Sequence, residues 1–272
     1  MPTLSMNELT TYRWSLEEDI QRYQQAGYEG IGVWRQKLED YGEERGVDLL
    51  VESGLKVTNL MWAGGFTGND GRRLTECIDD AVHAIRLAAA LNAGCLVIYA
   101  GGRNNHTYRN AEKLLRGALD ELLREAEDAE VDLALEPMHP ACAGDWTFLS
   151  DLESTIALID SYDSPHLKLV FDAYHFGHDR SVMANLEELA PYVGVVHLSD
   201  FNEPHSIDTN RCPLGEGRVE IDTLVQGLLE AGYEGDFDVE LRGSEIHPSR
   251  YQELLTGSRR CFESACASYV GS

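Results

Sequence analysis

Three carboxylates and one imidazole stand at the ends of four short apolar runs in this 272-residue chain. The runs VDLALE, LKLVFD, VGVVH and FDVE end at Glu136, Asp172, His197 and Glu240. Apolar runs rich in β-branched residues predict strands, and the spacing leaves room for one crossover helix each, since a βαβ unit needs roughly 30 residues. Oxygen ligands together with one imidazole suit a divalent metal ion.

Each of these residues also has a purely structural interpretation. An unpaired buried carboxylate is costly, so Glu136 and Glu240 at the ends of apolar strands indicate function. The alternative is a structural ion pair, for which Arg242 is a counter-charge beside Glu240. His197 alone could be a hydrogen-bonded core residue, but its place among carboxylates at equivalent strand ends favours metal ligation. Asp200 either orients His197 or caps the next turn.

Two histidines lie close to these residues in the sequence. His139 follows Glu136 in ALEPMHP and could be a base, a substrate contact or a loop histidine bonded to the backbone. His175 follows Asp172 in FDAYH, which places it on the same loop or first helical turn. His178 is interpreted as a solvated loop residue.

The segment 202–220 is long for a strand-to-helix connection, and long loops in compact domains are commonly functional. Arg211 within it is a candidate substrate clamp, because a guanidinium can hold a hydroxyl pair or a phosphate; the alternative is a solvated arginine. Trp62 is one of four tryptophans near the ends of expected elements. Aromatic walls suit the apolar faces of sugars, although core packing is the commoner role of a tryptophan.

Strand and helix patterns alternate along the whole chain. Strands are expected at 3–6, 30–34, 55–62, 95–101, 131–136, 167–172, 194–198 and 237–241. The clearest amphipathic helices are 74–91 and 109–129. Capping boxes are expected to start helices at Ser15, Ser150 and, as a variant, Ser249. The string AGYEG occurs at 26–30 and 231–235, each time between a helix and a strand, where its first glycine can end the helix.

Eight alternating units favour a closed α/β fold, a single (β/α)8 TIM barrel that occupies residues 1–272 as one domain. An open doubly wound sheet is the alternative; it usually carries a glycine-rich GxGxxG loop, which this chain lacks. In a barrel, the C-terminal ends of the strands meet at one face, so the four strand-end residues would share one pocket.

The charge composition limits the kinds of binding partner that the chain can have. The chain carries 47 acidic and 22 basic residues, a net charge of −25, which argues against binding to nucleic acid or an anionic membrane. A small-molecule substrate is expected instead, and assembly into a homo-oligomer stays open. No apolar run of membrane-spanning length and no signal peptide is visible, and the six cysteines form no CxxC pair, so a cytoplasmic location is expected.

The chain resembles the xylose-isomerase-like TIM barrel superfamily of sugar isomerases and epimerases. The motifs that carry the resemblance span nearly the whole chain: WSLEED, AGYEGIGVW, LEPMHP, FDAYH, VVHLSD, RCPLGEGRVEID and AGYEGDFDVE. In its ketose 3-epimerase and hydroxypyruvate-isomerase-like branches, Glu, Asp, His and Glu at four strand ends hold one divalent metal. The resemblance therefore implies metal ligation by Glu136, Asp172, His197 and Glu240, with the two glutamates as catalytic acid and base.

The same resemblance implies substrate binding by His175 and Arg211. His139 departs from the ketose epimerases; LEPxHP occurs in other sugar-phosphate-isomerase-like members, and a histidine base suits relatives that eliminate from 3-oxo-glycosides. The reaction expected is isomerisation or epimerisation of a sugar or sugar phosphate through an enediolate, with a lyase as the alternative. Mn²⁺ is the expected ion, with Mg²⁺, Co²⁺ or Zn²⁺ as alternatives. An endonuclease-like activity or a non-catalytic sugar-binding barrel are more remote alternatives.

Overall fold

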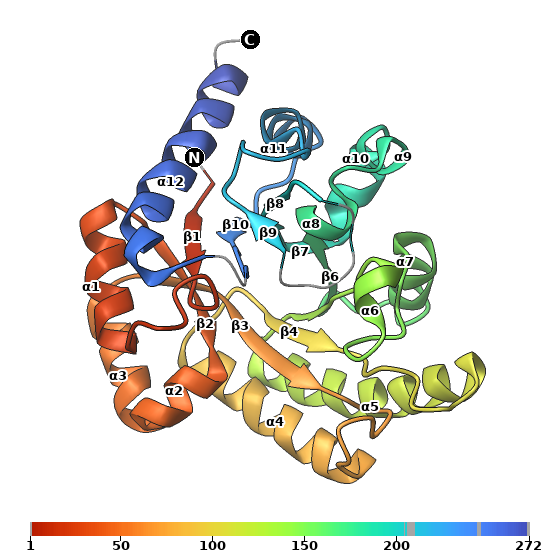
Figure 1. The fold of residues 1–272 in the computed structure, drawn as a ribbon. Coiled ribbons are helices and arrows are strands. Elements are labelled where there is room, and N and C mark those ends of the chain that lie inside the picture. Colours follow the sequence, from red (N-terminus) through yellow and green to blue (C-terminus); the bar gives the residue numbers. More distant parts are fainter. Residues whose placement is uncertain (1, 204, 206–209, 244–245, 271–272) are drawn as a thin grey trace.

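Eight parallel strands close into a barrel in the computed structural model, which describes residues 2–203, 205, 210–243 and 246–270 (Figure 1). Pairing runs in chain order around the barrel, and the last strand pairs with the first through Leu4 opposite Phe237. The barrel strands are β1 (Leu4–Asn7), β2 (Gly30–Trp34), β3 (Lys56–Gly64), β4 (Leu96–Tyr99), β5 (Leu133–Leu135), β6 (Leu167–Asp172), β7 (Val193–Leu198) and β10 (Asp236–Val239). The expected TIM barrel is confirmed, and the open sheet is not what the chain forms.

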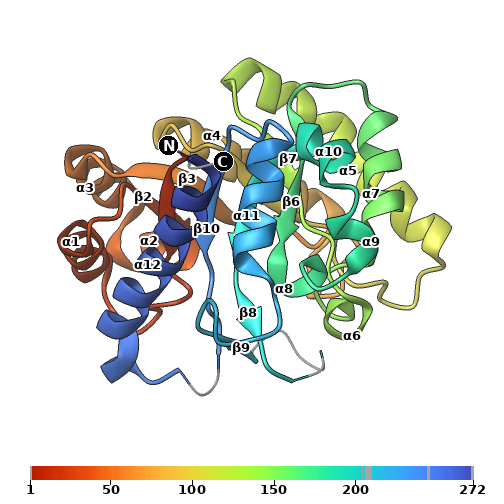
Figure 2. The same cartoon turned by 90° about the horizontal axis from the view of Figure 1, so that it is seen from above.

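Helices surround the barrel on all sides (Figure 1). They are α1 (Leu16–Ala26), α2 (Arg35–Tyr41), α3 (Glu43–Ser53), α4 (Leu74–Ala90), α5 (Tyr108–Ala129), α6 (Pro140–Ala143), α7 (Leu152–Asp160), α8 (Ala173–Phe176), α9 (Arg180–Met183), α10 (Leu186–Leu189), α11 (Ile221–Glu230) and α12 (Tyr251–Val270), with 3₁₀ turns Ala190–Tyr192 and Pro248–Arg250. A small antiparallel hairpin, β8 (Asp200–Phe201) with β9 (Arg211–Cys212), lies at the end of the barrel where β7 finishes (Figure 2). No helix in the described part of the chain combines the length and apolar character that crossing a membrane requires.

All eight expected strands are present, and β2 and β6 have the expected bounds. β5 and β10 stop one residue before Glu136 and Glu240, so these two glutamates begin the following loops. Their backbone N–H groups nevertheless donate to the neighbouring strands, at 3.1 Å to the Ile98 carbonyl and 3.0 Å to the Leu198 carbonyl. The sheet therefore still fixes the backbone positions of Glu136 and Glu240.

Of the three expected capping boxes, the one at Ser15 is confirmed, with reciprocal hydrogen bonds to Glu18. The prediction at Ser150 is wrong by one residue: Asp151 caps α7, and its carboxylate accepts from the backbone N–H of Ser154 at 2.7 Å. The prediction at Ser249 is also wrong, because Ser249 lies inside a 3₁₀ turn that runs directly into α12. Beside Ser150, Asp151 is the residue that caps the helix. Beside Ser249, Pro248 begins a 3₁₀ turn, because its fixed φ suits the first position of a helical turn.

The two AGYEG copies make the same local structure. Gly27 and Gly232 adopt φ values of 81° and 83°, a left-handed conformation that glycine enters without steric cost. The following tyrosines donate backbone hydrogen bonds back into the helix, Tyr28 to Tyr23 at 3.0 Å and Tyr233 to Leu228 at 2.9 Å. The repeat is thus a helix-ending device used twice in one barrel.

The interior of the barrel has an apolar and a polar part. The apolar part is a cluster of Leu9, Met61, Cys95, Val97, Ala134, Val170 and Val195. In the polar part, the buried Asp238 carboxylate accepts hydrogen bonds from Ser5 at 2.5 Å, Asn7 at 2.6 Å and Asn59 at 2.8 Å. Gly32 lies against Asp238; a Cβ there would meet its Oδ2 at 2.3 Å, so this close approach requires glycine.

Candidate metal centre

The four strand-end residues converge at the mouth of the barrel. Glu136, Asp172, His197 and Glu240 are all buried, and one ligand atom of each lies within 4.8 Å of those of the others. They come from β5, β6, β7 and β10, which are neighbours in the sheet, so residues distant in sequence meet in one place. His197 Nδ1 lies 3.1 Å from Glu240 Oε2 and 3.4 Å from Glu136 Oε1.

Burial and charge act differently on these groups. Burial raises the pKa of Glu136 to about 7, against the opposing effect of His197. Burial acts in the same direction on Glu240, but the positive charges of Arg211 and His197 outweigh it and lower the pKa of Glu240 to about 2. Burial alone would lower the pKa of His197, yet hydrogen bonding and attraction to the two glutamates raise it well above its usual range.

The donor set fits a divalent cation. Three buried carboxylates face one another, and such a group is stable only when positive charge is supplied. His197 Nε2 has no hydrogen-bond partner within the described ranges, although it is buried. Asp172 Oδ1 is fixed by the backbone N–H of Tyr174 at 2.7 Å, at the start of α8, which directs Oδ2 to the centre. Carboxylate oxygens with one imidazole match the preferences of Mn²⁺ and related ions.

Arg211 is a buried member of this centre. Its guanidinium lies 2.9 Å from Asp172 Oδ2 and 3.6 Å from Glu240 Oε2, and its Nη1 donates to Ser199 Oγ at 3.2 Å. It also lies over the ring of Tyr174, 4.8 Å from the centroid. The structure thus places Arg211 as a counter-charge to two of the candidate ligands, and its role as a substrate clamp stays a prediction.

Asp200 caps a turn. Its carboxylate accepts from the backbone N–H groups of Phe201 at 2.8 Å, Gly217 at 2.8 Å, Val219 at 2.9 Å and Gly215 at 3.2 Å. Of the two alternatives left by the sequence, the structure thus supports capping of the loop that carries Arg211 rather than orientation of His197.

An aromatic wall borders the centre. Trp62, Tyr99 and Trp146 pack edge to face, with ring centroids 5.3 to 6.4 Å apart, and together with Glu136 and Glu240 they line one small pocket. Such rings can pack against the carbon face of a sugar ring. Trp34 and Trp62 both pack against the apolar interior of the barrel, and Trp14 packs against Tyr251.

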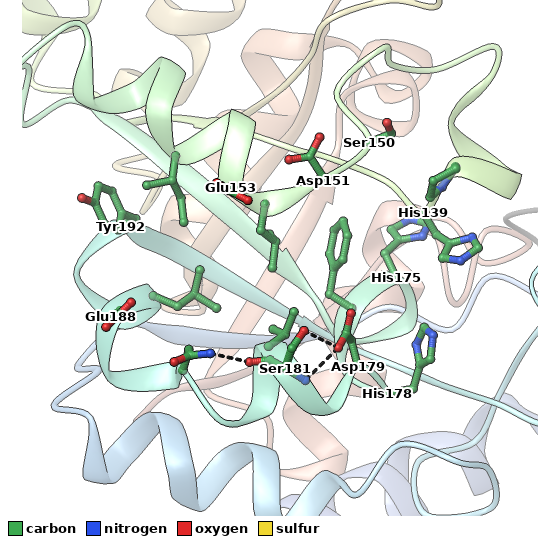
Figure 3. A pocket seen from close by; sticks show the side chains of 17 residues that line it. His139, Ser150, Asp151, Glu153, His175, His178, Asp179, Ser181, Glu188 and Tyr192 are labelled. Carbon is green, nitrogen blue, oxygen red and sulfur yellow. Dashed lines mark hydrogen bonds between the residues drawn. The ribbon is translucent and has the colours of Figure 1, made fainter.

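His139 and His175 lie toward a second, larger hollow. This groove has a volume of about 940 Å³ between α7 and α9–α10 (Figure 3). His175 is buried on α8, with its Nε2 3.8 Å from Asp172 Oδ2, so it touches the centre from the groove side. His139 caps α6, where its Nδ1 accepts from the backbone N–H of Ala141 at 3.2 Å. The two expected substrate contacts therefore face a different hollow from Trp62 and Arg211.

Sequence reasoning missed several residues of the pocket. Tyr99 ends β4 in the structure, but the sequence predicted a strand that runs on to residue 101, so Tyr99 did not stand at an expected strand end. Arg242, considered only as a counter-charge, lines the pocket and lies over Trp146 at 5.7 Å. Ser199, which links Arg211 to the Asp172 carboxylate, carried no signal in the sequence.

The barrel and its strand-end residues define a known class. The family described as xylose isomerase-like TIM barrel matches residues 20–261, and the chain belongs to this family.

Individual relatives are more distant. The chain is 24% identical to an inosose isomerase of Bacillus velezensis over 98% of each chain. It is 26% identical to a fructoselysine 3-epimerase of Shigella flexneri, over 84% of this chain and 86% of the relative. Among solved structures, the IOLI protein with a bound zinc atom superposes with a TM-score of 0.84 at 22% identity, over 98% of this chain and 99% of that one.

Proposed function

We propose that this protein is a divalent-metal-dependent isomerase or epimerase of a sugar or sugar phosphate. The observation that carries the proposal is the convergence of Glu136, Asp172, His197 and Glu240 in one buried cluster beside an aromatic wall. A buried excess of carboxylates is costly, and a bound cation with a polyhydroxylated substrate would use both the charge and the wall.

The relatives support the same class of chemistry. The two relatives are named as an inosose isomerase and a fructoselysine 3-epimerase, and both match this chain over most of its length. The zinc atom in the IOLI protein supports a metal in a barrel of this shape. For this chain, Mn²⁺ suits the oxygen-rich ligand set best, with Mg²⁺, Co²⁺ and Zn²⁺ as alternatives.

The mechanism would use the two glutamates as a proton-transfer pair. Glu136 follows β5 and Glu240 follows β10, with β6 and β7 between them, so their carboxylates approach the centre from separate strands. One carboxylate would remove the proton α to the substrate carbonyl, and the other would hold and return a proton. Return to the neighbouring carbon gives an isomer, and return from the opposite face gives an epimer. The bound cation would supply stabilisation of the negative charge that develops on the substrate oxygens.

The neighbouring residues would orient the substrate. Arg211 and His175 both lie against Asp172, and they would donate to substrate hydroxyls from the pocket side and the groove side respectively. Trp62 would pack against the carbon face of the sugar, and His139 would act at the groove side as a contact or a base. A small-molecule sugar as the partner and a cytoplasmic location are part of this proposal, consistent with the net charge of −25.

Proton exchange in D₂O tests this proposal directly. The Mn²⁺-loaded protein is incubated with a panel of ketoses, aldoses, their phosphates and 3-oxo-glycosides, and NMR follows loss of carbon-bound protons. We expect one substrate to exchange a single proton α to its carbonyl and to yield an isomer or epimer. Release of an aglycone from a 3-oxo-glycoside would show that the protein is a lyase and not an isomerase. Failure of every compound in the panel to exchange a proton or react would contradict the proposal.

A further inference from the structure

We propose that His139, His178 and His205 form a second cation site, separate from the carboxylate centre and suited to a transition-metal ion that prefers imidazole. The three residues follow β5, β6 and β7, so three successive connections at the mouth of the barrel supply one histidine each. One ring nitrogen of each lies within 4.8 Å of those of the other two. His139 and His178 lie at the same end of the groove, opposite Glu188 and Tyr192 (Figure 3).

The three rings are packed together. The His205 ring stacks on both others, with centroids 4.4 Å from His139 and 4.8 Å from His178, while His139 and His178 are 6.0 Å apart. The three rings therefore form a compact triangle, and Tyr174 and Phe201 lie against the ring of His205.

The hydrogen bond of His205 prepares it for ligation. Its Nε2 contacts the backbone carbonyl of Tyr174, and a carbonyl only accepts, so Nε2 carries the proton. Nδ1 then has a free lone pair. A ligating histidine commonly donates its other N–H to a backbone carbonyl in this way, which fixes both the tautomer and the ring orientation.

The charge state also favours a metal. Burial lowers the pKa of each of the three imidazoles, and the proximity of another imidazole lowers it further, so all three are neutral near pH 7. Only neutral imidazole binds a metal. This set has no carboxylate, so it should select Zn²⁺, Co²⁺, Ni²⁺ or Cu²⁺ over the Mn²⁺ or Mg²⁺ that oxygen ligands favour.

Ligation requires two local adjustments. Metal–nitrogen distances of about 2.0–2.1 Å require closer nitrogens than a 4.8 Å spread, so the rings must turn inward. His139 must also give up the 3.2 Å hydrogen bond from Ala141 whichever ring nitrogen binds the metal, because neutral imidazole has a single lone pair for the two roles. His178 is the most exposed of the three histidines and begins no helix, so its side chain is the most easily turned. Three protein ligands leave a fourth position for water or a substrate oxygen beside the groove.

Zinc titration by calorimetry tests this proposal. We expect the full-length chain to bind two equivalents of Zn²⁺. His178→Ala and His205→Ala should bind one, with at least a tenfold loss at the missing site. His139→Asn should do the same while keeping a side-chain acceptor for the cap of α6. His106→Ala, which removes a partly exposed histidine before α5, is the matched control and should keep two equivalents.

A spectroscopic readout separates the two sites. Four-coordinate Co²⁺ gives strong visible bands, so these should persist in His197→Ala and disappear in His178→Ala, with thermal melts confirming that both variants are folded. Cobalt bands that are lost in His197→Ala but kept in His178→Ala, or a zinc stoichiometry that none of the three histidine substitutions lowers, would overturn the proposal. Because the ligand sets differ, the result does not depend on whether the carboxylate centre catalyses sugar isomerisation.

Discussion

Two buried carboxylate clusters lie at strand ends of the same barrel. One is the candidate metal centre. The other consists of Glu8, which directly follows β1, and Asp19 on α1, with Lys37 on α2. In this second cluster the Lys37 ammonium forms a short ion pair with Asp19 and lies 3.8 Å from Glu8 Oε1. The backbone N–H of Trp34 donates to Glu8 Oε2 at 2.8 Å, and Thr11 donates to Asp19 at 2.6 Å.

The two clusters differ in where their positive charge comes from. At the second cluster, a lysine of the chain itself reaches the carboxylates and also donates to the Thr11 carbonyl at 3.3 Å. At the metal centre, three carboxylates share Arg211 and His197, which is itself a candidate ligand, and one ligand atom of each of the four candidate ligands lies within 4.8 Å of the others. A strand-end carboxylate is therefore structural where the chain supplies the cation, and a candidate for function where a cation must come from outside.

The largest expected effect is on catalysis. Glu136→Gln and Glu240→Gln each remove a proton-transfer group and a candidate ligand, so turnover should fall about 10³-fold or more, to judge from losses of 10²–10⁴ for general acid–base groups alone. Glu8→Gln, the same change in the other cluster, should leave turnover within about twofold. Steady-state assays on the substrate found by proton exchange measure this. Equal losses in all three variants would erase the functional difference between the clusters.

For stability, the large effect is expected at the second cluster. Lys37→Met leaves two carboxyl groups in the buried second cluster without their cation, which should cost about 3–5 kcal/mol of unfolding free energy in urea melts. Lys56→Met is the control: the Lys56 side chain is 49% exposed in its pair with Asp236, so less than about 1 kcal/mol should be lost. A Lys37→Met protein as stable as Lys56→Met would mean that the second cluster needs no internal cation.

Of the two carboxylate clusters, only the candidate metal centre should respond to metal removal. Chelation should abolish turnover, and Mn²⁺ at about 100 times its dissociation constant should then restore about 2.7 kcal/mol of stability. Thermal melts with and without Mn²⁺ measure the gain. In His197→Ala the gain should shrink, whereas Glu8→Gln should keep it. An unmodified chain whose turnover and melting are indifferent to chelation would remove the metal from the mechanism.

The barrel could be predicted from the sequence because the patterns that mark its strands and its helix ends are local. Strand patterns and helix-ending glycines such as Gly27 depend on a few adjacent residues, and all eight strands were found. The convergence of Glu136, Asp172, His197 and Glu240 followed from barrel geometry once the strands were known. Their roles as ligands and catalysts stay predictions.

Other features depend on contacts between distant segments and could not be predicted. Glu8 follows a strand just as Glu136 does, and only the approach of Lys37 from α2 distinguishes its environment. His205 gives no sign in the sequence that its ring stacks on His139. The same applies to Asp200, whose four backbone partners are brought to it by the folding of a loop.

The smallest expected effect is a pH dependence at the second cluster. Burial raises the pKa of Glu8 to about 8, although Lys37 opposes this. The folded state then holds a proton that the unfolded state releases above its ordinary pKa near 4.5. Folding is therefore favoured at low pH, and this contribution is lost as pH rises from about 4.5 to about 8.

Glu8→Gln imitates the protonated carboxyl at every pH. It should be nearly neutral at the acidic end of that range and stabilise the fold at the alkaline end, where the unmodified chain must hold Glu8 ionised in a buried site. Urea melts at both ends, on the variant and the unmodified chain, measure the difference. Parallel stability curves for the two proteins would show that Glu8 is ionised throughout, with Lys37 neutralising it as well as Asp19.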